Sequence, residues 1–317
     1  MAANHESKKP NPSVRNMIDQ NKSSKNLSQL VGKLMPFILF AFAAVSILTT
    51  VGIVYTLIME TIEFFKRVPF AEFFGSTKLK PLSAEPEFGI LPLINGTILS
   101  SLIAMLVAGP FGLMAAIYLS EYASDKVRRT LKPLLEVLAG IPTIVYGFFA
   151  FTFVTPILRA IWPSIDATNI LSPGIVMGIM IIPMIASLSE DAMNSVPNSM
   201  REGALALGAT RWETTFKVVM PAAFSGIVAS FVLAVSRAIG ETMIVTIASG
   251  STKNFTFDIT ESMQTMTAYI VEVTSGDAAA GTDIYYSIYA VGMTLFVMTL
   301  FMNLLARYIS RKFREEY

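Results

Sequence analysis

The sequence has no cysteine, a single histidine (His5) and few charged residues for its length. Without cysteine the chain can form neither a disulfide nor a thiolate metal site. One histidine also excludes zinc centres built on imidazole and catalysis by a histidine base, which leaves carboxylates, hydroxyls and amines as reactive groups. We therefore expect no metal site and no catalytic residue in this chain.

The sequence also lacks a phosphate-binding loop of the form G-x-x-x-x-G-K-[ST]. Gly32 and Lys33 are adjacent, but the upstream glycine and the following hydroxyl residue are missing. If ATP drives this protein, another chain must bind it together with Mg²⁺. No cofactor is expected in this chain.

Long apolar segments are what the chain does contain. Charged residues make up 15% of it, against roughly 25% in soluble domains. A helix rising 1.5 Å per residue crosses a hydrocarbon core of about 30 Å in about 20 residues, and six segments reach that length. They are residues 34–59, 90–119, 134–162, 170–189, 222–249 and 284–306. The sequence predicts an all-α, polytopic membrane protein with six transmembrane helices.

The first 33 residues are polar and rich in lysine, which is typical of a disordered tail. A secretory signal is the alternative, but residues 34–59 exceed the 7 to 15 apolar residues of a signal peptide. Of the 24 Lys and Arg, 17 lie in the tails and connectors of one side and 5 on the other side. This imbalance places both termini in the cytoplasm. The predicted domains are thus a tail at 1–33, a transmembrane domain at 34–307 and a short tail at 308–317.

One polar connector on the cytoplasmic side, residues 197–220, predicts two short helices. Gly208 fits the end of the first helix, because glycine tolerates a left-handed backbone. Thr210 and Glu213 have the spacing of a capping box that starts the second helix. Pro221 closes that helix or kinks its entry into the membrane. An ordinary loop between two spans is an equally good explanation from these residues alone.

The same connector resembles the EAA motif of ABC-transporter permease subunits, E-A-A-x3-G-x9-I-x-L-P. Glu202, Ala204, Gly208 and Pro221 occupy its first, third, seventh and twentieth positions, and Gly203 replaces its second alanine. In that family the motif forms coupling helices that sit in a groove of the ATPase subunit. The resemblance implies that these five residues contact an ATPase.

Two charges lie inside the fifth apolar segment, Arg237 and Glu241. An arginine near the middle of the bilayer costs about 2.5 to 3.5 kcal/mol on insertion scales. Spacing of four residues puts both side chains on one helix face, where they can pair and turn toward the bundle interior. The planar fork of arginine suits a tetrahedral oxyanion. The pair is therefore a candidate substrate site, with a purely structural ion pair as the alternative.

The run around this pair, S-R-A-I-G-E-T-M at 236–243, resembles the R-A-x-G-E-T-M signature of the PstC family of phosphate-specific ABC permeases. Residues 136–147 are similar to the E-L-L-A-A-I-P-S-I-V-Y-G stretch of the same family, with Thr143 in place of serine. The resemblance covers about 34–311. It implies a substrate pathway or gate formed by Arg237, Glu241, Thr242, Thr143 and Tyr146.

The resemblance also implies a fold and a role. The fold is the type I (MetI-like) permease fold of ABC importers. The role is to move inorganic phosphate by alternating access across the cytoplasmic membrane of a bacterium or archaeon. Its partners would be a homologous permease subunit (PstA-like), two ATPase subunits (PstB-like) and an extracytoplasmic phosphate-binding protein (PstS-like), with no nucleic acid. Two alternatives stay open: a molybdate or sulfate permease, and an ion-coupled secondary carrier in which Glu241 is protonated.

Overall fold

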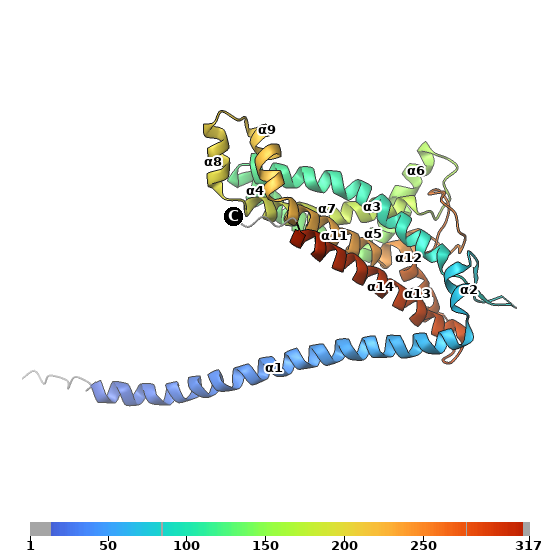
Figure 1. Ribbon diagram of the computed structural model, residues 1–317, viewed down its shortest axis with the longest axis horizontal. Coiled ribbons are helices and arrows are strands. Elements are labelled where there is room, and N and C mark those ends of the chain that lie inside the picture. Colours follow the sequence, from blue (N-terminus) through green and yellow to red (C-terminus); the bar gives the residue numbers. More distant parts are fainter. Residues whose placement is uncertain (1–13, 84, 277, 313–317) are drawn as a thin grey trace, which may run out of the picture. The chain divides into compact units, whose positions relative to one another are not determined.

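The computed structural model describes residues 14–83, 85–276 and 278–312 as helices joined by turns and loops, with one short hairpin. The elements, among them three π-helical turns labelled η, follow one another as α1 (Val14–Arg67), α2 (Phe70–Gly75), β1 (Leu79–Lys80), β2 (Glu87–Phe88), α3 (Leu91–Ile117), η1 (Tyr118–Tyr122), α4 (Asp125–Ala139), α5 (Thr143–Phe149), η2 (Ala150–Val154), α6 (Thr155–Ile161), α7 (Leu171–Asn194), α8 (Asn198–Ala206), α9 (Arg211–Thr214), η3 (Thr215–Val219), α10 (Met220–Ala222), α11 (Phe224–Ile239), α12 (Met243–Ala248), α13 (Met266–Ser275) and α14 (Asp283–Lys312) (Figure 1). The strands pair antiparallel, with Leu79 opposite Phe88. The all-α class expected from the sequence is confirmed.

The chain divides into two compact units, Met1–Thr56 and Leu57–Tyr317. The first unit contains the N-terminal part of α1. Between residues 31 and 56 its side chains are exposed, apart from half-buried Ala44 and Val54. A helix that is apolar on all sides is suited to lipid or to contact with other helices.

The predicted disordered tail, residues 1–33, differs from the structure from Val14 onward, where α1 begins. No proline or glycine occurs between Pro12 and Gly32. Once a helix has formed, adding residues to its end is favourable, so the helix of the first span extends toward the N-terminus. Residues 1–13 lie outside the described residues.

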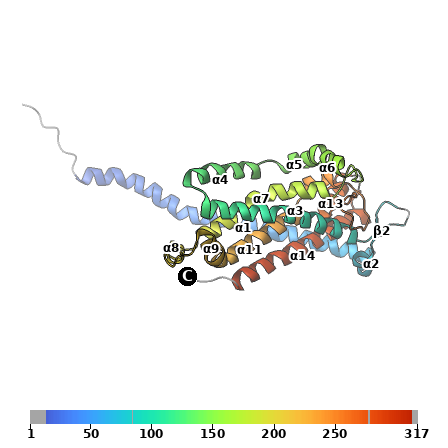
Figure 2. The same cartoon turned by 90° about the horizontal axis from the view of Figure 1, so that it is seen from above.

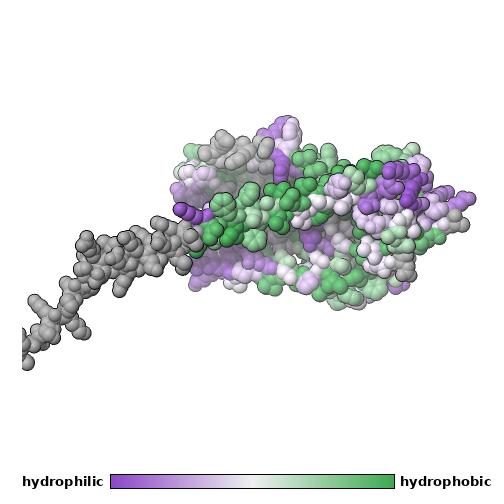
Figure 3. All heavy atoms as spheres, turned by 90° about the horizontal axis from the view of Figure 1, so that it is seen from below, coloured by the Kyte–Doolittle hydropathy of each residue, from purple (hydrophilic) through white to green (hydrophobic). Residues whose placement is uncertain are grey.

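Five of the described helices are long and apolar enough to cross a membrane, and a bent pair makes six if it counts as one span. The five are Val31–Arg67, Leu91–Tyr122, Thr143–Ile161, Leu171–Asn194 and Asp283–Ile309, and the bent pair is Arg211–Ala222 with Phe224–Ile239. The third span starts later than predicted, because α4 is a separate helix. Broad hydrophobic areas cover the surface between the ends of the bundle in Figure 3, and hydrophilic residues gather toward both ends.

The fifth predicted span, residues 222–249, is not one continuous helix. α11 ends at Ile239 after 16 residues, and the six-residue α12 starts only at Met243. Gly240 lies at the break with φ −86° and ψ 0°, and glycine disfavours a helix interior by about 1 kcal/mol relative to alanine. The two charges that were predicted within a helix therefore lie at an interruption.

The second unit is built around α7. α3 runs along one side of α7, and α11 packs against both α7 and α14, so that these helices lie side by side in Figures 1 and 2. A Cβ added at Gly112 would lie 2.8 Å from Ile185, so the absence of a side chain lets α3 and α7 approach closely. Between α7 and α11 the hydroxyls of Ser189 and Ser230 lie 2.7 Å apart. The core is thus made by close helix packing with buried hydroxyl pairs.

The connectors gather at the two ends of this bundle. α8 and α9 lie at one end, where Arg201 of α8 contacts Glu121 of η1 (Figure 1). α2 and the hairpin lie at the other end, where Phe64, Phe73 and Phe88 share a hydrophobic cluster. The connectors predicted to be cytoplasmic around η1 and α8 therefore meet at one end.

Candidate functional site

Arg237 and Glu241 meet at the break between α11 and α12. Arg237 is in the last turn of α11, and Glu241 lies two residues before α12. Nη1 of Arg237 donates a hydrogen bond of 2.9 Å to Oε2 of Glu241. The ion pair inferred from the spacing is confirmed, although Glu241 lies beyond the end of the helix that carries Arg237.

Glu241 is buried and has partners for both carboxylate oxygens. Its side chain is 2% exposed. Besides the bond from Arg237, Oε1 accepts a hydrogen bond of 3.2 Å from the backbone N–H of Met243, one of the free donors at the start of α12. The Glu241 carbonyl accepts a bond of 2.6 Å from the hydroxyl of Thr267 in α13. Glu241 is thus held in place from three directions.

Arg237 is the open half of the pair. Its side chain is 44% exposed, so the expectation that both charges turn inward holds for Glu241 and is wrong for Arg237. Within the described part of the chain, its one further polar contact is a weak one of 4.0 Å from Nη2 to Sδ of Met180. A guanidinium has five N–H donors in a planar fork. Most of the Arg237 donors are therefore free to bind an anion.

The other three predicted pathway residues, Thr242, Tyr146 and Thr143, do not take part in the ion pair of Arg237 and Glu241. Thr242 precedes α12, and its hydroxyl donates to the carbonyl of Gly240 at 3.3 Å. Tyr146 is buried in α5, and its hydroxyl donates a hydrogen bond of 2.8 Å to the carbonyl of Leu138 in α4. This bond connects α4 to α5, and the hydroxyl proton is not available to a ligand. Thr143 is half-buried at the start of α5.

α5 and α12 pack closely, which brings Tyr146 near the break. A Cβ added at Gly147 would lie 2.9 Å from Cδ1 of Ile247 and 3.0 Å from the carbonyl oxygen of Met243. Gly147 therefore serves the close packing of α5 against α12. Tyr146 shares its hydrophobic cluster with residues on both sides of the break, among them Ala238.

The helix–turn–helix predicted at residues 197–220 is confirmed as α8 and α9. Gly208 has φ +87°, in the left-handed region, and its N–H donates to the carbonyl of Leu205 at 3.0 Å. The Thr210 hydroxyl accepts from the Glu213 N–H at 3.3 Å, and Oε2 of Glu213 accepts from the Thr210 N–H at 3.1 Å. The glycine stop and the capping box are therefore both present.

The surface of α8 and α9 is open and partly apolar. Glu202 and Gly203 are exposed, Ala204 is half-buried, and no side chain of α8 is fully buried. Leu207 and Trp212 are exposed by 91% and 63%. Large apolar side chains held outward beside polar ones are typical of a surface that contacts another protein.

The chain returns to the bundle through η3 and α10, which contains Pro221 near its start. The helix axis then turns by 71° before α11. A proline has no N–H for the helix ladder and disfavours a continuous helix. The change of direction lies at Ala223, two residues after Pro221, close to where the sequence predicted that the second helix ends or kinks.

Sequence reasoning missed a group of ion pairs at the end of the bundle near α8. Glu190 is fully buried in α7, where its Oε1 lies 2.6 Å from Nη2 of Arg128 and its Oε2 lies 3.3 Å from Nζ of Lys132. Burial alone would lower the pKa of Lys132, but a hydrogen bond to Asp191 and the charge of Glu190 raise it above its usual range. An acidic residue at the end of an apolar segment, opposite a basic connector, is the sequence signal for such a pair.

Comparisons with known proteins agree with this architecture. The profile of the family described as "Binding-protein-dependent transport system inner membrane component" matches residues 108–315. The probable ABC transporter permease protein YqgH of Bacillus subtilis (strain 168) is 33% identical over 304 residues, 95% of this chain and 97% of that protein. The phosphate transport system permease protein PstC of Mesorhizobium japonicum is 34% identical over 259 residues, 74% of this chain and 78% of that protein. A probable PstC of Methanocaldococcus jannaschii is 30% identical and covers 91% of this chain and 97% of its own length.

Solved structures of ABC importers share the fold. A bacterial ABC transporter involved in the import of the acidic polysaccharide alginate aligns with a TM-score of 0.62 and 18% identity, covering 92% of this chain and all of the matched chain. The MetNI methionine ABC transporter in an inward-facing conformation aligns with a TM-score of 0.54 and 17% identity, covering 72% of this chain and 95% of the matched chain. At such identities the likeness concerns the fold, which is that of type I ABC importer permeases.

Proposed function

We propose a substrate and specific partners for this chain from the premise that it belongs to the family of binding-protein-dependent transport system inner membrane components. The chain is therefore a multi-pass inner-membrane permease subunit of an ABC importer, and ATP is bound by separate ATPase subunits. The complex also contains a partner permease and a periplasmic binding protein. The ion-coupled secondary carrier left open by the sequence belongs to another class and is dropped.

Inorganic phosphate is the proposed substrate. The observation that carries this proposal is the exposed guanidinium of Arg237, anchored by the buried carboxylate of Glu241. An arginine fork gives an oxyanion two parallel charge-assisted hydrogen bonds. The run 236–243 resembles the phosphate-specific signature, and several relatives are named as phosphate permeases. Molybdate or sulfate is the second candidate, because the same fork fits any tetrahedral oxyanion.

Each predicted residue then has a proposed role. Arg237 binds the anion, Glu241 orients Arg237, and the Thr242 hydroxyl exchanges its long bond of 3.3 Å to the Gly240 carbonyl for a bond to the anion. Thr143 and Tyr146 line or support the same pathway from α5, with Tyr146 acting through its bond to α4.

The exposure of Arg237 also argues for a second permease subunit against this face. A guanidinium facing lipid at the bilayer centre costs about 2.5 to 3.5 kcal/mol. In the assembled importer this face must therefore be covered, and we assign the cover to a homologous PstA-like subunit. The phosphate pathway then runs between the two permeases, and a PstS-like protein delivers phosphate at the end opposite α8.

The helices α8 and α9 are the proposed contact with a dimer of PstB-like ATPases. Glu202, Gly203, Ala204 and Gly208 form or shape this surface, and Pro221 sets the angle at which it leaves the bundle. In this arrangement both termini are cytoplasmic. ATP binding closes the ATPases, and the motion of α8 and α9 opens the spans outward.

A reconstitution experiment tests the substrate. The chain is purified with its co-expressed partner permease and ATPase, placed in proteoliposomes with the binding protein, and assayed for uptake of radiolabelled phosphate. We expect ATP-dependent uptake that excess arsenate inhibits and excess sulfate or molybdate does not. Transport of sulfate or molybdate in preference to phosphate would contradict the substrate and favour the second candidate.

A further inference from the structure

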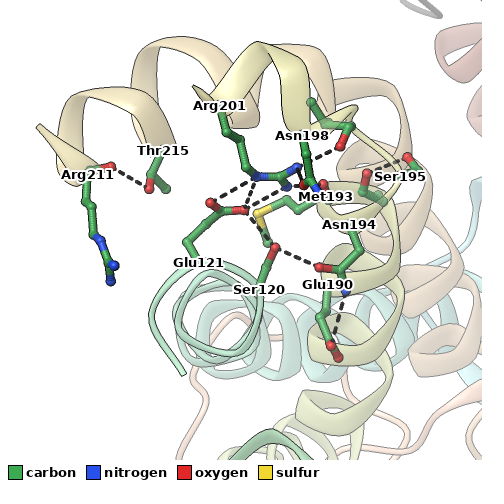
Figure 4. A network of polar contacts seen from close by, with 12 residues as sticks. Ser120, Glu121, Glu190, Met193, Asn194, Ser195, Asn198, Arg201, Arg211 and Thr215 are labelled. Atoms are coloured by element: carbon green, nitrogen blue, oxygen red, sulfur yellow. Dashed lines mark hydrogen bonds and ion pairs between the residues drawn. The ribbon is translucent and has the colours of Figure 1, made fainter. Parts of the chain in front are cut away.

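Arg201, in α8, engages every nitrogen of its guanidinium. Its side chain is 16% exposed and that of its partner Glu121 is 9% exposed. Nη2 donates to Oε1 of Glu121 at 2.9 Å and to the Met193 carbonyl at 2.7 Å. Nη1 donates to the Val196 carbonyl at 2.7 Å and to Oδ1 of Asn198 at 3.3 Å, and Nε donates to Glu121 at 3.3 Å (Figure 4). Arg201 has little capacity left for any other ligand.

These contacts join three elements that are distant in sequence. Glu121 lies in η1 at the end of α3, Met193 lies in the last turn of α7, and Arg201 belongs to α8. The last carbonyls of a helix have no partner within it, and a cation there is favoured by the helix dipole. Arg201 therefore satisfies the end of α7 and the buried carboxylate of η1 together.

The polar contacts continue from Glu121 to α4. The Ser120 hydroxyl lies 2.9 Å from Oε1 of Glu121 and 3.2 Å from Oδ1 of Asn194. Nδ2 of Asn194 donates to Oε1 of Glu190 at 3.3 Å (Figure 4). Glu190 in turn pairs with Arg128 of α4, as described above. One continuous set of contacts thus links α8, η1, α7 and α4.

Apolar packing alone does not explain how α8 and α4 are held at this end. Neither helix has a fully buried side chain, although Met200 of α8 packs partly against the cluster that contains Met193. A cavity of about 160 Å³, lined by Lys132, Pro183 and Glu190 among others, lies between α4 and α7. A small number of directed polar contacts must therefore fix the angle of α8 and the position of α4.

We propose that Arg201, Glu121, Ser120, Asn194 and Glu190, called here the Arg201 junction, fix α8 to the ends of α3, α7 and α4, so that a displacement of α8 moves these ends as one body. Arg201 is a positioning residue, since it touches neither the substrate nor ATP. The inference rests on the proposed function, because it takes α8 and α9 as the contact with the ATPase. Without the junction, ATPase movement would tilt α8 without moving the spans.

The test uses the complete importer in proteoliposomes and measures phosphate uptake and ATP hydrolysis in the same sample. Two variants weaken the junction. Glu121→Gln removes the negative charge and keeps the shape of the side chain, and Arg201→Met removes the guanidinium. We expect hydrolysis to stay within about twofold of wild type while phosphate taken up per ATP falls about tenfold. The matched control is Lys66→Met, which breaks an exposed pair with Glu63 of 2.7 Å and is expected to leave both quantities unchanged.

A rescue separates positioning from folding. Because the chain has no cysteine, the double variant Glu121→Cys with Arg201→Cys can be bridged specifically by a bifunctional thiol reagent whose spacer replaces the lost side chains. We expect the bridge to restore uptake per ATP to within about twofold of wild type, whereas a monofunctional reagent does not.

Three results would overturn the role proposed for the junction. They are an unchanged ratio of phosphate taken up to ATP hydrolysed in both variants, a parallel fall of uptake and hydrolysis, or no assembled complex in any variant. Failure of the proposed function looks different. A wild-type chain that co-purifies with no ATPase removes that function, and the junction with it. A wild-type complex that transports another anion is assayed with that anion, which leaves the junction test intact.

Discussion

The chain contains two arginine–glutamate pairs with opposite surroundings. In the pair at the break after α11, the carboxylate of Glu241 is buried and both its oxygens are bonded, while Arg237 is 44% exposed and keeps most donors free. At the end of the bundle that carries α8, Arg201 is 16% exposed and bonds Glu121 together with two backbone carbonyls. The same two residue types thus form an open pair in one place and a closed pair in the other.

The difference shows that an ion pair by itself does not reveal its role. What matters is how many donors of the arginine are already used, since a guanidinium with free donors can bind an oxyanion and one without them can only hold protein groups together. The open pair joins neighbouring residues of one segment, whereas the closed pair joins residues 80 positions apart. We therefore assign binding to the first pair and positioning to the second.

Removing the free donors of Arg237 tests whether the open pair binds the anion. Arg237→Gln should lower phosphate uptake about 100-fold or more, because two charge-assisted hydrogen bonds of at least about 1.5 kcal/mol each are lost. ATPase co-purification should persist, since Arg237 lies in α11 and belongs to neither of the helices α8 and α9 that form the proposed ATPase contact. Uptake by proteoliposomes and the amount of co-purified ATPase are the two measurements.

The double variant Arg237→Gln with Glu241→Gln is the control for charge imbalance. It removes the unpaired buried carboxylate that the single variant leaves, and it still lacks an anion ligand. We expect it to assemble well and to transport no better than the single variant. Recovery of uptake near the wild-type rate would show that the open pair is structural, and the contrast with Arg201 would disappear.

A somewhat smaller loss is expected at the turn between α8 and α9. Gly208→Pro replaces a residue at φ +87° by one fixed near −65° and removes the N–H that bonds to Leu205. The angle between the two helices must change, so uptake should fall by about tenfold while the chain still inserts. Gly208→Asn is the matched control, because asparagine tolerates the left-handed region. Normal uptake by the proline variant at normal membrane abundance would argue against the coupling role.

A smaller effect still is expected from changing Thr267, which holds the backbone of Glu241 in the open pair. Thr267→Val removes the hydroxyl that bonds to the Glu241 carbonyl at 2.6 Å, and an unpaired buried carbonyl costs about 1–3 kcal/mol. Glu241 then holds Arg237 less firmly, so the KM for phosphate should rise without complete loss of uptake. Thr274→Val, in the same helix, removes an exposed bond to the Ile270 carbonyl and should change nothing. Equal effects of the two variants would mean that Thr267 contributes only through helix stability.

Features that depend on neighbouring residues could be predicted from the sequence. The apolar segments, the left-handed Gly208, the capping box of Thr210 and Glu213, and the pairing of Arg237 with Glu241 all follow from local spacing. The break after Ile239 was missed because hydropathy alone does not distinguish a continuous span from two short helices.

The Arg201 junction could not be predicted in the same way. Glu121 and Arg201 meet only because α3 and α7 pack along each other and bring their ends together. The partner of Tyr146 was likewise set by the geometry of the turn between α4 and α5, which no motif specifies. Local chemistry therefore identified the open pair, while tertiary packing was needed to find the closed one.

Single cysteine variants that should leave transport unchanged can show on which side of the membrane each end of the bundle lies. Ser124 and Ser275 are both exposed, the first before α4 and the second at the end of α13. Single cysteines at these positions, in a chain that has no other thiol, report the side of the membrane that each occupies. A membrane-impermeant thiol reagent should label Ser275→Cys in intact cells and Ser124→Cys only in inverted vesicles, because the side richer in Lys and Arg is cytoplasmic. The opposite pattern would put Arg201 outside the cell, where it could not position helices against an ATPase, and would leave the closed pair without the role assigned to it.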